Sequence, residues 1–241
     1  MSLERAPLAQ EMASHPLFAG VCSQTPDANR AAFTRQNVRR SSVIFDQGEE
    51  ASAVFLVLRG CVALNRIAPC GREIAPALLG PGSIAGADAL TDLGGYRSAR
   101  AVGLADATGL LVTATELMRI VASDGSVASN LIRILCLQHE ATVATLEELA
   151  TLNVVERIAR FLGRLTVPGE GQSNTMLRVG LPLTHQEIAA FVSSSRETVS
   201  LAMGQLARAG RIARDRHGYA VRCEPEESAI RSAISAAPLA C

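Results

Sequence analysis

The sequence predicts an α+β chain: an N-terminal β-roll of the jelly-roll type, one long helix, and a C-terminal pair of short helices followed by a β-hairpin. Three observations carry this prediction. Short apolar stretches alternate with glycine turns over residues 41–122, as is typical of all-β barrels and jelly rolls. No Gly or Pro interrupts residues 127–152, so one long helix is expected there. Helix-capping patterns and an alternating hairpin pattern occupy residues 183–222.

The composition allows two domains and indicates where an anionic partner binds. The chain has 241 residues, of which 48% are hydrophobic, and its formal net charge is zero. All 23 basic residues are Arg. Between Val154 and Cys223 there are ten Arg against five Asp or Glu. A basic surplus confined to one part of a chain is the footprint of contact with nucleic-acid phosphates.

The sequence carries no signal for a membrane or for secretion. Apolar runs such as Ala53–Leu58 are far too short to cross a bilayer. The N-terminus lacks the charged start and apolar run of a secretory signal. The six cysteines are scattered without a C-x-x-C pair. A cytoplasmic protein with reduced thiols is therefore expected.

The first two segments are a lead-in and the β-roll. Residues 1–40 are expected to form helices and loops, and residues 41–122 the β-roll. Its strands are expected at residues 43–45, 54–58, 61–64, 74–79 and 100–112. Its glycine turns are expected at residues 47–49, 59–60, 70–71 and 80–82.

The long helix, expected within residues 123–152, carries two apolar stripes. One stripe advances by alternating steps of three and four residues: Ile132, Leu135, His139, Thr142, Leu146 and Leu149. Such a seam pairs two chains as a coiled coil. The other stripe, through Leu131 and Ile134, is expected to pack on the β-roll. Asn153 with Glu156 then makes a capping box, so a new helix is expected to run from there to about Leu165, with the hinge at Leu152–Asn153.

Two further caps predict a helix-turn-helix. Thr184 caps the first helix and Glu187, three residues on, completes a capping box. Val192–Ser193 makes the turn. Ser194 or Ser195 caps the second helix, and Ser194 with Glu197 repeats the capping-box spacing. The buried side of this second helix is expected to consist of Val199, Met203 and Leu206.

The opposite face of the second helix presents Arg196, Glu197, Ser200 and Leu201. A helix in the major groove presents its N-terminal residues to base edges, where Arg suits guanine acceptors and Glu suits the cytosine amino group. A solvated, well-capped helix terminus is the alternative interpretation. The hairpin over residues 211–222, with Arg214 and Arg216, favours a winged helix-turn-helix at residues 153–225, followed by a tail at 226–241. Thr184, His185 and Ser195 are further candidate DNA contacts.

A set of short motifs resembles the Crp/Fnr family, the bacterial regulators that include the cyclic-AMP receptor protein. The motifs are Phe45-Asp46-Gln47-Gly48-Glu49, Val57-Leu58-Arg59-Gly60, Gly80-Pro81-Gly82-Ser83-Ile84-Ala85-Gly86, Arg97-Ser98-Ala99, Glu156-Arg157-Ile158-Ala159, Thr184-His185-Gln186-Glu187-Ile188-Ala189 and Ser195-Arg196-Glu197-Thr198-Val199. The resemblance implies a homodimer held by the long helix, with a cyclic-nucleotide-binding-like sensor domain. It also implies double-stranded DNA, RNA polymerase and a small-molecule effector as partners. Many relatives have a second Arg one position after Ser200, where this chain has Leu201.

The resemblance also locates an effector site, from which this chain departs at one position. In cyclic-nucleotide binders of the family, a short helix after Gly86 binds the phosphate, an Arg-Ser pair assists, and a Glu accepts from the ribose hydroxyl. Arg97 and Ser98 stand at the phosphate positions, but Ala87 stands at the Glu position. Because the Ala side chain cannot accept a hydrogen bond, ordinary cyclic AMP is not expected, and another ligand, anionic or of mixed character, is favoured. Asp88 is expected to point elsewhere. In the alternative interpretation, Arg97 holds a structural turn.

Other sensor chemistries leave the cofactor undetermined. Only Cys22 precedes Cys61, so the four thiolates of an iron–sulfur cluster do not assemble. His139 and Thr142, on the seam beside the sensor pocket, are candidate effector contacts, and His139 is also a candidate haem ligand. Cys136, His139 and Glu140 have the spacing of a metal site. The alternative for His139 is a polar residue that specifies pairing. A redox role for one exposed Cys also stays open.

The sequence therefore predicts a sequence-specific transcription regulator on a pseudo-palindromic site. It contains no paired carboxylates, nucleophile elbow or complete metal motif, so no enzyme is expected. The alternative is a ligand-binding regulatory module that acts through protein contacts.

Overall fold

The computed structural model describes residues 8–21, 24–91, 95–167, 176–215 and 218–222. The chain forms two compact units, Met1–Leu64 with Leu78–Glu140, and Asn65–Ala77 with Ala141–Cys241. The long helix α4 (Gly125–Thr151) continues from the first unit into the second. Its bounds agree with the long helix that the sequence predicts.

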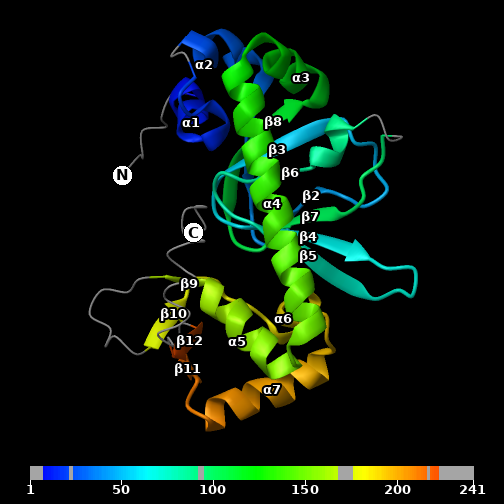
Figure 1. Ribbon diagram of the computed structural model, residues 1–241, viewed down its shortest axis with the longest axis vertical. Coiled ribbons are helices and arrows are strands. Elements are labelled where there is room, and N and C mark those ends of the chain that lie inside the picture. The colour runs from blue at the N-terminus through cyan, green and yellow to red at the C-terminus, as the bar shows by residue number, and fades with distance from the viewer. Residues whose placement is uncertain (1–7, 22–23, 92–94, 168–175, 216–217, 223–241) are drawn as a thin grey trace. The chain divides into compact units, whose positions relative to one another are not determined.

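The β-roll consists of two four-stranded sheets, which confirms the predicted fold class (Figure 1). The first sheet has the order β1-β8-β3-β6, with strands Phe33–Val38, Ala107–Thr113, Ala53–Arg59 and Ile84–Ala85. The second has the order β2-β7-β4-β5, with strands Val43–Phe45, Arg100–Gly103, Val62–Ile67 and Glu73–Leu79. Four consecutive residues of β3, Val54–Val57, are buried, as expected for a central strand covered on both faces.

Two elements of the first unit differ from the prediction. The lead-in contains the expected helices, α1 (Leu8–Ser14) and α2 (Gln24–Asn29) with the short turns η1 (Pro16–Phe18) and η2 (Arg30–Ala32), but it also contains strand β1. Only the two ends of β1 are buried, so it lacks the alternation that marks a strand. Its pairing with β8, from Phe33↔Val112 to Val38↔Ala107, positions it instead. Helix α3 (Ala114–Ser123), capped by Thr113, replaces the end of the predicted β segment.

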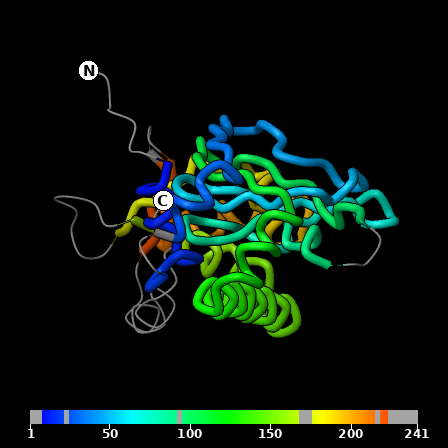
Figure 2. The backbone as a smooth tube through the Cα atoms, turned by 90° about the horizontal axis from the view of Figure 1, so that it is seen from above, coloured from blue at the N-terminus to red at the C-terminus, as the bar shows by residue number. Residues whose placement is uncertain are grey.

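The N-terminal half of α4 packs on the β-roll, as its second apolar stripe predicts. Leu131 and Ile134 belong to a buried cluster with Leu56, Ile84 and Leu110. The Gln138 side-chain amide also pairs with the backbone of Ile84, accepting from its N–H at 3.2 Å and donating to its carbonyl at 3.0 Å. Figure 2, which looks along α4, shows the β-roll strands to one side of this helix.

The exposure of α4 corrects the predicted seam. Leu135 is half-buried against the core of the first unit, and Leu149 is half-buried beside Phe161 of the second. These two residues face their own chain. The exposed stripe instead runs through Ile132, Cys136, His139, Val143 and Leu146, with the same alternation of four and three. Four of the six residues of the predicted seam, Ile132, His139, Thr142 and Leu146, are thus exposed, and pairing of two chains along this side of α4 stays a prediction.

Among its described residues, the second unit contains the end of α4, three shorter helices and a small sheet. Helix α5 (Val154–Arg164) begins with the predicted Asn153–Glu156 capping box. Helices α6 (His185–Phe191) and α7 (Arg196–Arg208) follow, and Phe161 of α5 stacks on Phe191 of α6 at 4.7 Å between ring centroids. The sheet has the order β11-β12-β10-β9, with strands Ile212–Asp215, Gly218–Arg222, Met176–Val179 and Thr166–Val167, of which the sequence did not predict the last two.

None of the helices in the described ranges combines the length and the hydrophobicity that crossing a bilayer requires.

Candidate DNA-reading surface and effector site

The first helix of the predicted helix-turn-helix is capped as expected. The Thr184 hydroxyl accepts from the Glu187 backbone N–H at 3.2 Å. The Glu187 carboxylate accepts in turn from the Thr184 N–H at 2.7 Å. The capping box therefore uses two N–H groups that the helix itself leaves unpaired, and it determines where α6 begins.

The turn selects one of the two candidate caps for α7. Ser193 adopts a left-handed conformation, with φ of 50°, and the Ser194 N–H donates to the Ala189 carbonyl at 2.9 Å. Ser195 is the N-cap, and its hydroxyl accepts from the Thr198 N–H at 3.1 Å. The predicted Ser194–Glu197 capping box is therefore wrong, because Ser194 closes the preceding turn.

The two faces of α7 divide as predicted. Val199, Met203 and Leu206 are buried. Arg196, Glu197 and Ser200 are exposed, and the Leu201 residue is 71% exposed. A hydrogen bond from its own backbone N–H, followed by one from the Ser195 hydroxyl, lowers the pKa of Glu197. Near neutral pH this surface therefore presents a cation, a carboxylate acceptor, a hydroxyl and an apolar side chain at the start of one helix.

His185 links three elements of this unit. Its Nδ1 lies 2.8 Å from the Ser200 hydroxyl of α7, and its Nε2 lies 3.0 Å from the Tyr219 hydroxyl of β12. Burial, followed by the positive charges of Arg214 and Arg196, lowers the pKa of His185. The imidazole is thus neutral at neutral pH, with one ring nitrogen a donor and the other an acceptor. His185 therefore orients Ser200 relative to the hairpin.

The predicted wing is a hairpin of β11 and β12, paired from Ile212↔Val221 to Asp215↔Gly218. The exposed Arg214 guanidinium lies 5.4 Å from the centre of the Tyr219 ring. The other predicted wing cation, Arg216, lies outside the described residues. Arg214 thus belongs to the same cluster as His185 and Ser200.

The predicted effector residues Gly86, Arg97 and Ser98 come together in the β-roll. The Arg97 side chain is 3% exposed. Its Nη1 donates to the Gly86 carbonyl at 3.1 Å, its Nη2 donates to the Ala53 carbonyl, and its guanidinium lies 4.0 Å from the centre of the Phe45 ring. Gly86 has φ of 80°, and a Cβ there would lie 2.5 Å from Nη1 of Arg97. A glycine is therefore required at this position.

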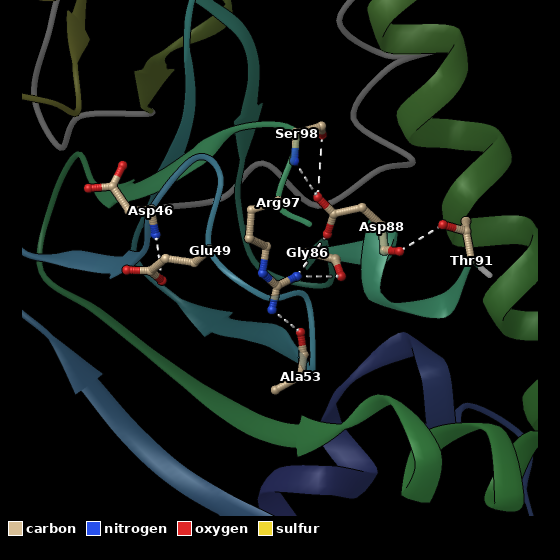
Figure 3. Close-up of polar contacts among 8 residues, drawn as sticks. All are labelled: Asp46, Glu49, Ala53, Gly86, Asp88, Thr91, Arg97 and Ser98. Atoms are coloured by element: carbon tan, nitrogen blue, oxygen red, sulfur yellow. Dashed lines mark hydrogen bonds and ion pairs between the residues drawn. The ribbon is translucent and has the colours of Figure 1, made fainter. Parts of the chain in front are cut away.

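The anion at this site is a side chain of the protein itself. Arg97 Nη1 donates to Oδ1 of Asp88 at 2.8 Å, and Oδ2 of Asp88 accepts from the N–H and the hydroxyl of Ser98 at 3.0 and 3.3 Å (Figure 3). The expectation that Asp88 points elsewhere was wrong. Asp88 lies in η3 (Ala87–Leu90), a turn whose direction depends on the left-handed Gly86. The sequence signal was only an acidic residue beside Ala87.

The remaining effector candidates take no part in this network. Ala87 is half-buried and packs against the core of the β-roll. His139 and Thr142 are exposed on α4. Cys136 and Glu140 are exposed as well, and no three His, Cys, Asp or Glu side chains gather into a metal site in the part of the chain that the structure describes.

Comparisons with known proteins support the assignment of both the β-roll and the helix-turn-helix. Residues 35–124 match the family model of a cyclic nucleotide-binding domain, and residues 156–225 match that of a Crp-like helix-turn-helix domain. The cyclic AMP receptor protein of Thermus thermophilus is 32% identical over 199 residues, which cover 83% of this chain and 88% of the relative. The CRP-like cAMP-activated global transcriptional regulator of Mycobacterium tuberculosis is 29% identical over 196 residues, which cover 80% and 87%.

A solved structure shows the same fold. FixK2 from Bradyrhizobium japonicum superposes with a TM-score of 0.66 at 22% identity, covering 81% of this chain and 94% of that one. With its β-roll, its long helix and its winged helix-turn-helix, the chain belongs to the Crp/Fnr family and is a Crp-like DNA-binding transcription regulator with a cyclic-nucleotide-binding domain.

Proposed function

We propose that α7 enters the major groove and that Arg196, Glu197, Ser200 and Leu201 read base edges there. The observation that supports this is the division of α7, in which these four side chains are exposed opposite the buried Val199, Met203 and Leu206. Arg196 then makes a bidentate contact to a guanine, Glu197 accepts from a cytosine amino group, and Leu201 lies against a thymine methyl. Thr184 and Ser195, the N-caps of α6 and α7, and His185, the first residue of α6, are the other candidate DNA contacts.

The functional unit in this proposal is a homodimer. The two chains pair through the exposed stripe of α4, and the dimer reads two half-sites about one helical turn apart, because two-fold symmetry of the protein matches two-fold symmetry of the DNA. The domain boundaries at residues 41, 123, 153 and 226 stay predictions. The regulator works in the cytoplasm, together with RNA polymerase, and has no reaction of its own.

The signal is proposed to enter through the β-roll. Gly86, Ala87, Arg97 and Ser98 form the candidate effector site, and His139 and Thr142 on α4 are further candidate contacts. Because Ala87 cannot accept a hydrogen bond from a ribose hydroxyl, ordinary cyclic AMP is not the expected effector. Native mass spectrometry and an absorption spectrum of the purified protein test for dimerisation, a retained ligand and a haem.

Arg196→Ala is expected to weaken binding to the preferred duplex by roughly 1–3 kcal/mol and to relax the preference at one base pair of each half-site. The reason is that a bidentate contact to guanine supplies both affinity and discrimination. Selection from random duplexes, followed by titration of the selected site, measures both effects. Arg208→Ala is the control, because Arg208 is an exposed Arg at the other end of α7.

Two outcomes would refute this assignment. Either a selected half-site contains no guanine whose preference depends on Arg196, or Arg208→Ala has the larger effect. If the chain shows no preference for any duplex over random sequence, it is a regulatory module that acts through protein contacts.

Arg214→Ala in the wing is expected to weaken binding to all duplexes alike and to reduce the slope of log K against log salt by about one. Arg214 is exposed on β11, where a cation contacts phosphate and not a base edge. Titrations of a selected and a scrambled duplex at several salt concentrations measure this. A loss confined to the selected duplex would instead make Arg214 a base-reading residue.

A further inference from the structure

The anion-binding groups of the β-roll are already occupied. Arg97 and Ser98 are the two residues at the phosphate positions. Three of their hydrogen-bond donors converge on the same acceptor group: Nη1 of Arg97, and the N–H and hydroxyl of Ser98. All of them end on the Asp88 carboxylate (Figure 3). A carboxylate and a phosphodiester take the same charge-assisted donors. A phosphate group therefore cannot bind these atoms while Asp88 holds them.

Asp88 has an advantage over any free anion. It lies nine residues from Arg97 in sequence and on the same rigid β-roll, so its local concentration at the site is on the order of millimolar or higher. It also neutralises a guanidinium that is 3% exposed, which otherwise would be a buried, unpaired charge. A monoanionic phosphodiester brings no more charge than the carboxylate that it must displace.

The site is nevertheless reachable from solvent. The Asp88 side chain is 23% exposed, and Ser98 is exposed. Nε of Arg97 is buried and has no hydrogen-bond partner among the described residues. If Asp88 turned outward, Nη1 of Arg97 and the N–H and hydroxyl of Ser98 would lose their shared acceptor. These donors could then bind an anion from solvent.

We propose that Asp88 is an internal ligand of the Arg97–Ser98 site and that it excludes cyclic nucleotides from this β-roll. The chain therefore carries its own anion where a signalling phosphate would bind, and an effector phosphate can enter only when Asp88 leaves. This inference rests on the proposed role of the β-roll as the sensor. It is independent of how α7 reads DNA.

Calorimetry with cyclic AMP and with inorganic phosphate, without DNA and at matched ionic strength, tests the proposal. We expect no measurable binding of either anion to the unaltered protein, and saturable binding of both to Asp88→Ala through the phosphate, without a ribose contact because Ala87 is unchanged. If Asp88 leaves the site in about one molecule in a hundred, its removal strengthens anion binding by up to about 100-fold. The control is Glu116→Ala, which removes a carboxylate from an exposed pair with Arg119 on α3 and should bind like the unaltered protein.

The outcomes are decisive in both directions. Micromolar cyclic-AMP binding to the unaltered protein, or equal affinity of the unaltered and Asp88→Ala proteins, overturns the proposal. If inorganic phosphate binds Asp88→Ala as tightly as cyclic AMP does, the proposal is supported and the site recognises only the phosphate group. Because DNA is absent, failure here leaves the Arg196 experiment unaffected, and failure there leaves this one unaffected.

A second variant covers loss of folding. Asp88→Asn preserves the shape of the side chain but removes the charge that neutralises Arg97. If either variant unfolds at low ionic strength, added phosphate or cyclic AMP should restore its circular dichroism spectrum and raise its melting temperature, whereas matched chloride should not. Unfolding that no anion reverses would show that Asp88 is a structural counter-ion and would contradict the proposal.

Discussion

Leu146→Glu is expected to convert the proposed homodimer into a monomer and, with it, to abolish tight binding to the two half-sites. The Leu146 residue is 66% exposed in the single chain and lies on the stripe with Ile132 and Val143. Burying one Leu on each of two chains contributes about 3 kcal/mol or more, which corresponds to a change of more than about 100-fold in the dimer dissociation constant. The charge of Glu adds a desolvation cost. Sedimentation equilibrium over a range of protein concentrations measures the shift.

Leu137→Glu is the matched control. Leu137 is an exposed Leu of the same helix, at 42%, and lies nine residues from Leu146, which is half a turn around the helix axis at 3.6 residues per turn. It should leave the dimer intact. A Leu146→Glu protein that remains a dimer would show that the exposed stripe of α4 is not the interface.

The free energy of unfolding is expected to fall by about 2 kcal/mol when the pH is lowered from about 7.5 to about 5, because of His15 alone. His15 is 1% exposed. Its Nδ1 accepts from the Leu17 N–H at 3.2 Å, and its Nε2 lies 3.4 Å from the Ser83 carbonyl. Burial, partly offset by the contact with the Ser83 carbonyl, lowers the pKa of His15 from 6.5 to about 4. A proton on Nδ1 would also remove the acceptor of the Leu17 N–H.

The free energy of unfolding falls at low pH because the pKa of His15 is lower in the folded chain than in the unfolded chain. The folded chain binds this proton less readily than the unfolded chain, so the stabilisation is fully present above pH 6.5 and is lost as the pH falls towards 4. Urea unfolding followed by circular dichroism, at constant protein concentration, measures this loss. In His15→Gln this part of the loss should be absent, while carboxylate titration remains. An unchanged pH dependence in His15→Gln would mean that folding does not lower the pKa of His15.

Much of the DNA-reading unit could be predicted from the sequence because its signals are local. The capping boxes at Asn153–Glu156 and Thr184–Glu187 need only residues three apart, and both occur as expected. The division of α7 into a buried and an exposed face follows from helical periodicity. The sequence could not distinguish Ser194 from Ser195 as the cap of α7. In the structure the Ser194 N–H donates to the Ala189 carbonyl, and Ser195 is the N-cap.

Which apolar residues of α4 are exposed depended on tertiary structure. The apolar residues of this helix allow two neighbouring stripes with the same alternation of three and four. Only packing shows that Leu135 and Leu149 are used by their own chain, which leaves Ile132, Val143 and Leu146 exposed. Strand β1 was missed for a similar reason. It has no alternating pattern of apolar residues, and it is a strand because it pairs with β8.

By itself the sequence determined the order of the units, the helix caps, the face of α7 and the presence of Arg97 and Ser98 where an anion binds. Only the tertiary structure showed which anion is there. Asp88 reaches Arg97 because Gly86 turns the chain into η3 with a left-handed φ, and the segment before β7 that carries Arg97 and Ser98 lies beside it. Side-chain direction on so short a turn depends on contacts distant in sequence, and no local pattern records those contacts.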